Sequence, residues 1–241
     1  MNTCILMGLF AHFMADFTFQ TNYIAAKKAE SYFGVFLHCV IVFITSLLAV
    51  LPWGSIAVPF ALVLAVMHFG IDCHKLFYTK KYNPSMLEHF YIDQGLHVLT
   101  VLVLVFIFGL NRITPPMLDS KLISDFLKIG NALLIIFGAN TIAIVLYMSK
   151  LSRDEVIISF NIISRFKNSI CGLFFLLPFL LISKTDYILA LGGIRFVLAI
   201  ASLALAFYLN YKLNMGISKR DRTLKILFHL IWAIIIIPIF F

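Results

Sequence analysis

The sequence predicts an all-α fold, a polytopic membrane helix bundle of about eight transmembrane helices with both termini outside. Of its 241 residues, 62% are hydrophobic and only 12% are charged, and the mean hydropathy is +1.01. Soluble domains carry about 25% charged residues. The sequence also contains apolar runs separated by short basic loops. These runs are candidate membrane spans, because a helix needs about 17–25 apolar residues to cross the hydrocarbon core of a bilayer.

Eight apolar runs are candidate spans, and the sixth of them is short. In chain order they are Thr3–Tyr23, Phe33–Leu51, Ser55–Phe77, Met86–Leu110, Gly130–Met148, Ser169–Ile182, Tyr187–Tyr208 and Thr223–Phe241. Only the polar pair Lys184 and Thr185 separates the sixth run from the seventh. The spacing therefore predicts eight crossings, with the least support for the sixth.

The basic residues predict the orientation, because cytoplasmic loops hold an excess of Lys and Arg. Of the 19 Lys and Arg residues, 14 lie in the odd-numbered loops or within three residues of them, 4 lie in the even-numbered loops and one, Arg195, lies inside the seventh span. Both termini are therefore predicted outside. This topology and contact with anionic lipid explain the net charge of +8, so no nucleic acid is expected as a partner.

The chain is predicted to divide at a loop that contains Pro115 and Pro116. Six of the seven histidines precede that loop. We predict a four-helix membrane domain with His/Asp motifs over residues 1–110, an external loop over 111–128, and a second four-helix membrane domain over 129–241 that acts as scaffold.

Polar residues recur at helical spacing within the first four predicted spans. Residues four apart lie on one face of a helix. The stripes are His12, Asp16 and Gln20 in "LFAHFMADFTFQ"; His68, Asp72 and Lys75 in "HFGIDCHK"; and His89, Asp93 and His97 in "EHFYIDQGLH". His38 lies near the start of the second span. The predicted orientation brings these residues to the cytoplasmic half of the bilayer.

Ionisable groups inside a membrane cost about 2.5–3.5 kcal/mol each and need compensation. Imidazole nitrogens and carboxylate oxygens together suit zinc, iron or manganese, so a divalent metal ion is predicted, with zinc first. The predicted ligands are His12, Asp16, His68, Asp72, Asp93 and His97, with His38 and His89 as additional candidates. A metal-free proton relay and purely structural hydrogen bonding between helices are the alternatives.

The same stretches resemble a known family. "HFMADFTFQ", "HFGIDCHK" and "IDQGLH" are similar to the H-x3-D-F-x2-Q, H-x2-I-D-x2-K and D-Q-x2-H motifs of the DUF3307 family, integral membrane proteins of bacteria and phages whose function is unknown. The resemblance covers about the first 110 residues. It implies a multi-pass protein of the bacterial inner membrane and no particular activity.

Three functions from different classes are compatible with this sequence. The first is a metal-dependent hydrolase acting on a lipid or other amphiphile from the cytoplasmic side, with Asp16, Asp72 and Asp93 as catalytic carboxylates. In it, Gln20, Lys75 and Gln94 would bind substrate. The second is a transporter or channel for metal ions or protons. The third is a non-catalytic subunit, a homo-oligomer or one that binds a cytoplasmic partner through its basic loops.

Overall fold

A computed structural model describes residues 2–82, 86–112, 114–140, 142, 170–178, 189–213 and 219–240 of the protein. Every regular element within these ranges is helical and none is a strand, which confirms the all-α prediction. The chain forms two compact units, divided in the described part after Leu134.

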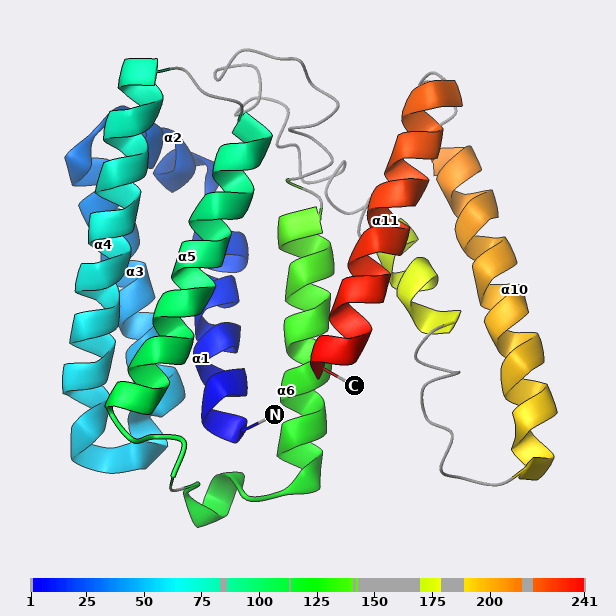
Figure 1. The fold of residues 1–241 in the computed structure, drawn as a ribbon, viewed down its shortest axis with the longest axis horizontal. Helices are drawn as coiled ribbons and strands as arrows, with labels where there is room; N and C mark the ends of the chain where they lie inside the picture. The colour runs from blue at the N-terminus through cyan, green and yellow to red at the C-terminus, as the bar shows by residue number, and fades with distance from the viewer. Residues whose placement is uncertain are drawn as a thin grey trace. The chain divides into compact units, whose positions relative to one another are not determined.

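The helices of the first unit are short segments and long apolar rods (Figure 1). Its elements are α1 (Thr3–Phe13), the π-helical turn η1 (Met14–Phe19), α2 (Asn22–Glu30), α3 (Tyr32–Val50), the 3₁₀ turn η2 (Leu51–Ile56), α4 (Ala57–Tyr82), α5 (Met86–Ile107), the 3₁₀ turn η3 (Pro116–Leu118) and α6 (Lys121–Leu134). The second unit contains η4 (Ile135–Asn140), helical residues 170–178, α10 (Leu189–Leu213) and α11 (Lys219–Phe240).

Local capping explains where the first helices break. The Thr21 hydroxyl accepts a hydrogen bond from the Ile24 amide at 3.3 Å, and the Ser31 hydroxyl accepts one from the Gly34 amide at 3.1 Å, as N-cap residues do. These caps start α2 and α3 as separate helices. The predicted first span, Thr3–Tyr23, is therefore too long: its helix ends at Phe19, and Tyr23 belongs to α2.

The predicted start of the fifth span, Gly130, is also corrected. The Ser120 hydroxyl accepts a hydrogen bond from the Ile123 amide at 3.2 Å, and Lys121 pairs with Asp125 one turn later at 2.8 Å. These contacts stabilise a first helical turn at Lys121. The second half of the predicted external loop 111–128 is thus helical.

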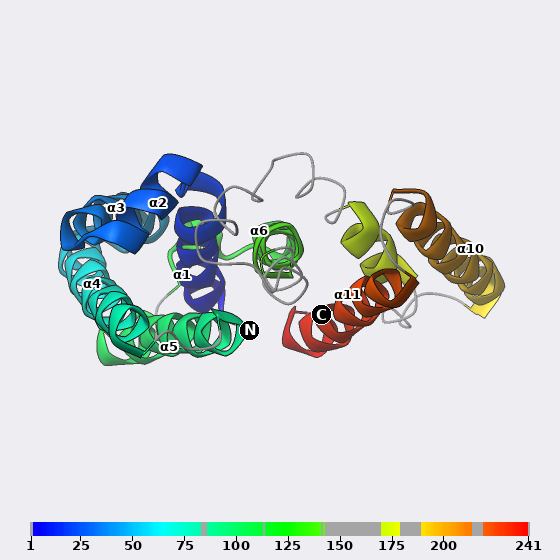
Figure 2. The ribbon, with the colours of Figure 1, turned by 90° about the horizontal axis from the view of Figure 1, so that it is seen from above.

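Four long helices of the first unit surround a common interior, and each packs on its neighbours in the order α1, α3, α4, α5 and back to α1 (Figure 2). Small residues permit close contact: a Cβ on Gly8 of α1 would lie 2.8 Å from Val101 of α5, as in other membrane bundles. The helix α6 packs on α1, and Asn131 donates to the Leu6 carbonyl at 2.9 Å. The first compact unit of the structure thus extends to Leu134. The prediction that residues 1–110 and 129–241 form two separate membrane domains stays a prediction.

The first unit has many large apolar side chains on its outside and a group of ionisable side chains among its buried residues. Leu48 is 65% exposed and Ile107 is 70% exposed, whereas His38 is 0% and Asp72 1% exposed. Large exposed apolar surfaces of this kind mark contact with a membrane. The ionisable groups share this interior with buried apolar side chains such as Phe60 and Leu64.

Three described helical stretches are long and apolar enough to cross a membrane. They are Tyr32–Tyr82, Leu87–Ile107 and Lys121–Ala139. The first of these is the α3–α4 hairpin, which turns at Gly54, a glycine with a φ of 73°. The helices indicate a membrane protein, whereas eight spans and outside termini stay predictions. Parts of the predicted fifth and sixth spans, the first two residues of the seventh and the last residue of the eighth lie outside the described residues.

Candidate metal centre

Seven ionisable residues from four helices meet in the interior of the first unit, and each is at most 6% exposed. They form what is here called the polar cluster: His12 of α1, Asp16 of η1, His38 of α3, His68 and Asp72 of α4, and Asp93 and His97 of α5. Three of the helices contribute the i, i+4 pairs that the sequence predicts. The structure brings all six predicted metal ligands together and adds His38.

Four side-chain atoms of the cluster lie close to one another and are here called the four-atom cage: Asp16 Oδ1, His38 Nε2, His68 Nε2 and Asp72 Oδ2. His38 Nε2 lies 3.2 Å from Asp16 Oδ1 and 3.1 Å from His68 Nε2. His68 Nε2 lies 3.6 Å from Asp16 Oδ1 and 3.3 Å from Asp72 Oδ2. The fifth distance, from His38 Nε2 to Asp72 Oδ2, is 3.9 Å.

Five of the six distances within this set can be compared with those of a tetrahedral metal site. Zinc binds imidazole nitrogen and carboxylate oxygen at about 2.0–2.2 Å, so a regular tetrahedron of such ligands has edges of about 3.3–3.6 Å. The five edges of the four-atom cage lie between 3.1 and 3.9 Å. Two imidazole nitrogens at 3.1 Å need either a shared proton or a shared cation. The ligand set and its size thus suit a divalent ion.

A second set of ligand atoms adjoins the cage and is here called the three-atom group: Asp72 Oδ1, Asp93 Oδ1 and His97 Nε2. His97 Nε2 lies 3.5 Å from Asp72 Oδ1 and 3.4 Å from Asp93 Oδ1, and ligand atoms of the three residues lie within 4.8 Å of one another. The His97 and His68 rings stack at 3.8 Å. Asp72 therefore contributes one oxygen to each set.

His12 stands beside both sets. Its Nδ1 lies 3.9 Å from Asp16 Oδ1, and its ring centroid lies 5.3 Å from that of His97. With Asp16 and His68 it forms another group of ligand atoms within 4.8 Å. Its Nε2 is buried and has no hydrogen-bond partner among the described residues, so this nitrogen is available to a metal, a proton or a ligand.

Three polar side chains that belong to neither set of ligand atoms contact the carboxylates of the cluster. Lys28 Nζ lies 2.7 Å from Asp72 Oδ2, and Lys75 Nζ lies 2.6 Å from Asp93 Oδ2. The Gln94 amide nitrogen donates to Asp16 Oδ2 at 3.1 Å, which leaves Asp16 Oδ1 facing the cage. Such partners fix the orientation of ligating groups. The prediction that Lys75 and Gln94 bind substrate remains a prediction.

Lys28 is the residue that sequence reasoning missed. It lies in α2, outside the candidate spans, where the sequence pattern marks it only as a basic loop residue. Burial disfavours its charged form, but the carboxylates of Asp72, Asp16 and Asp93 outweigh that effect and raise the pKa of Lys28 above the ordinary lysine value. Lys28 therefore brings a permanent positive charge to the cluster. No helical periodicity could have revealed this contact.

Two predicted site residues lie elsewhere. Gln20 ends the π-helical turn η1 in an extended conformation, and no described hydrogen bond joins it to the cluster. A π-helical turn holds more residues than an α-helical one, so the four-residue spacing from Asp16 to Gln20 does not keep them on one face. His89 is half-buried one turn before Asp93 and stacks on Tyr78 with ring centroids 4.8 Å apart.

The two additional candidates, His38 and His89, therefore have opposite expected effects. His38→Ala removes one of four cage atoms and is expected to weaken zinc binding at least about 100-fold, because loss of a partner to a ligand already costs about 10–100-fold. His89→Ala is expected to change zinc affinity less than about twofold. Competition with a chromophoric chelator measures both. Equal losses in the two variants would contradict the assignment of the cage.

The amino-terminal half of the chain matches a known family. Residues 4–121 match the family described as "Protein of unknown function (DUF3307)", and this range includes every member of the polar cluster. No curated protein and no solved structure matches the chain. The polar cluster, whose ligand geometry suits a divalent ion, thus lies in a region of the chain that belongs to the DUF3307 family.

Proposed function

We propose that this protein binds a divalent metal ion, zinc by preference, within its first helical unit and uses it to hydrolyse a lipid or other amphiphile. The observation that carries the proposal is the four-atom cage: five of its six interatomic distances, 3.1–3.9 Å, lie near the edges of about 3.3–3.6 Å of a tetrahedral zinc site, and His38, His68 and Asp72 form a group whose ligand atoms lie within 4.8 Å of one another. Hydrogen bonding between helices alone does not require four ligand atoms at these mutual distances.

The three-atom group supports the hydrolytic part of the proposal. Catalytic zinc sites have three protein ligands and keep one position for water, which the ion activates, whereas structural sites have four. Asp72, Asp93 and His97 offer such a set of three. The unpaired Nε2 of His12 is buried beside it and would exchange a proton with the reacting group. Asp72 contributes one carboxylate oxygen to the four-atom cage and the other to the three-atom group.

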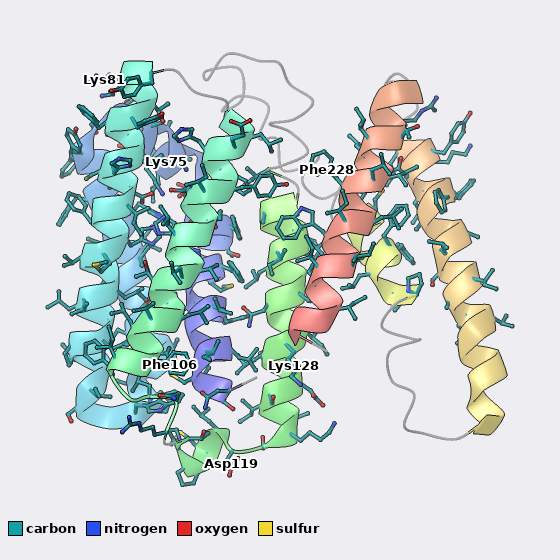
Figure 3. The ribbon with its side chains drawn as sticks, in the orientation of Figure 1. Lys75, Lys81, Phe106, Asp119, Lys128 and Phe228 are labelled. Atoms are coloured by element: carbon teal, nitrogen blue, oxygen red, sulfur yellow. The ribbon has the colours of Figure 1, made fainter. Side chains whose placement is uncertain are left out.

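The distribution of charge supports a location and an orientation. The first unit carries Lys75, Lys80 and Lys81 toward one end of α4, and Figure 3 shows Lys75 and Lys81 toward that end and Phe106 and Asp119 toward the other. By the excess of Lys and Arg in cytoplasmic loops, the lysine end would face the cytoplasm. We place the protein in the bacterial inner membrane as a multi-pass protein that receives its substrate from that side.

Elemental analysis of the detergent-purified protein tests the metal. Wild type, purified without chelators, is expected to hold at least about one zinc, iron or manganese ion per chain. The combined variant Asp16→Ala, Asp72→Ala and Asp93→Ala is expected to hold none while eluting as a folded species. Background metal in the wild type would overturn the proposal.

A second assay tests the reaction. The metal-loaded protein is incubated with ester-, amide- and phosphate-linked lipids, and products are sought by mass spectrometry beside the combined variant. Products formed by the wild type alone would support hydrolysis. Bound metal with no product from any lipid, together with metal uptake into proteoliposomes, would replace hydrolysis by transport.

A further inference from the structure

The side chain of Lys28 reaches the polar cluster from α2, a short helix whose position is fixed by contacts of its last turn. The helix α2 has no buried residues of its own, and it lies across the end of α3 (Figure 1, Figure 2). Its last turn is fixed at three points: the Ser31 amide donates to the Lys27 carbonyl at 3.0 Å, Lys80 Nζ donates to the Glu30 carbonyl at 2.8 Å, and Gly34 packs directly against the Lys27 carbonyl. These contacts aim Lys28 inward, whereas Lys27 points out and pairs with Glu30 at 3.1 Å.

Lys28 and a metal ion in the four-atom cage would share one oxygen. Lys28 Nζ lies 2.7 Å from Asp72 Oδ2, which is a corner of the cage. Two cations on one carboxylate oxygen repel each other, and at short range in a weakly polar interior this repulsion is strong. A bound ion therefore weakens the hold of Asp72 on Lys28 and leaves the ammonium group in need of another anion.

The net charge of the polar cluster together with its partners Lys28 and Lys75 also indicates an anion. With neutral imidazoles, as metal ligation requires, the carboxylates of Asp16, Asp72 and Asp93 and the ammonium groups of Lys28 and Lys75 leave one net negative charge. One divalent ion changes this to one net positive charge, and two ions change it to three. Net charge buried in a membrane is unfavourable, so the metal-loaded cluster requires an anion whichever number of ions it holds.

The two ammonium groups lie where such an anion would arrive. The side chains of Lys28 and Lys75 are 13% and 33% exposed, while those of their partners Asp72 and Asp93 are 0% and 4% exposed. Lys75 lies toward the Lys81 end of α4 (Figure 3), and α2 lies across that same end in Figure 1. Both lysines thus stand between the surface of that end and the ligand atoms.

We propose that Lys28 and Lys75 bind the phosphate group of a ligand, and that this anion completes the metal-loaded cluster. Lysine is a common binder of phosphate oxygens, and two ammonium groups beside a divalent ion form a set that recognises phosphate in other proteins. The inference rests on the proposed metal site and specifies its ligand: the amphiphile is a lipid that carries a phosphate group. The titration below distinguishes such a lipid from free phosphate.

The test uses the full chain, loaded with one equivalent of zinc, in phosphatidylcholine nanodiscs. Inorganic phosphate, phosphatidic acid and diacylglycerol with the same acyl chains are titrated separately, and binding is followed by calorimetry. Wild type is expected to bind phosphatidic acid at least about tenfold more tightly than diacylglycerol. Binding of inorganic phosphate but not phosphatidic acid would show a site for the free ion and overturn the lipid assignment.

Paired variants of α2 then locate the anion. Lys28→Met, loaded to the same zinc content as wild type, is expected to weaken anion binding at least about tenfold, because it lacks one of the two ammonium groups. Lys27→Met, the same change at the adjacent residue, is expected to leave anion binding unchanged. Lys28→Arg keeps the charge and should preserve binding. If Lys28→Met fails to fold, Lys28→Gln, which retains a donor to Asp72, takes its place.

Zinc content of every sample separates the possible failures. Wild type that holds zinc but binds neither phosphate ligand would overturn this inference and leave the metal site standing. So would equal anion affinity in wild type and the neutral Lys28 variant. Wild type without zinc would overturn the proposed function and this inference together.

Discussion

Asp72→Asn is expected to lower bound metal from at least about one ion per chain to background. Asp72 is the residue common to both sets of ligand atoms: its Oδ2 belongs to the four-atom cage and its Oδ1 lies 3.5 Å from His97 Nε2. Asparagine has nearly the same size, but it is neutral and keeps only one oxygen, so it cannot serve both sets. Elemental analysis of the purified variant measures the loss.

The matched control for this change is Asp125→Asn. Asp125 is an acidic residue of α6 in the same unit, where it pairs with Lys121 at 2.8 Å outside the polar cluster. Its replacement is expected to leave the metal content of the protein unchanged. Size-exclusion chromatography shows whether both variants remain folded. Full metal content in a folded Asp72→Asn variant would contradict the assignment of both sets of ligand atoms.

Gly34→Ala is expected to detach α2 from α3 and to lower the free energy of unfolding by about 1–3 kcal/mol, the usual cost of overpacking. A Cβ at residue 34 would collide with the backbone carbonyl of Lys27, and backbone cannot move aside as a flexible side chain can. Because α2 carries Lys28, anion binding should weaken as it does in Lys28→Met. Thermal unfolding in detergent and the phosphate titration measure the two effects.

Gly70→Ala provides the comparison for Gly34→Ala. Gly70 lies in α4 of the same unit, and a Cβ there would meet nothing within 4 Å. Alanine is favoured over glycine inside a helix by about 0.5–1 kcal/mol, so this variant is expected to be at least as stable as wild type. If Gly34→Ala matched it in stability and anion binding, α2 would not depend on the contact with Lys27.

The composition of the polar cluster was predictable because it depends on local spacing. An acid four residues from a histidine lies on the same face of an α-helix, and the membrane makes an isolated pair unfavourable. The pairs His12 with Asp16, His68 with Asp72 and Asp93 with His97 followed from this reasoning, and the structure places them together. Gln20, the last residue of the first stripe, follows η1 in an extended conformation, so it does not continue the helical face of His12 and Asp16; its role in binding substrate stays a prediction.

What spacing cannot supply is the rotation of one helix against another. His38 and His89 had equal standing in the sequence, yet His38 Nε2 lies 3.1 Å from His68 Nε2, while His89 stacks on Tyr78 outside the cluster. The packing of α3 and α5 against α4 decides this difference, and packing depends on contacts between residues far apart in the chain.

The sequence by itself determined a helical membrane protein and six of the seven residues of the polar cluster, because apolar length and helical repeat are local properties. Only the tertiary structure decided that His38 joins the cluster, that Asp72 serves two sets of ligand atoms, and that Lys28 pairs with Asp72. The physical reason is that charge pairing depends on distance in space. Lys28 and Asp72 are brought to 2.7 Å by the docking of α2 on α3, which the periodicity of neither segment encodes.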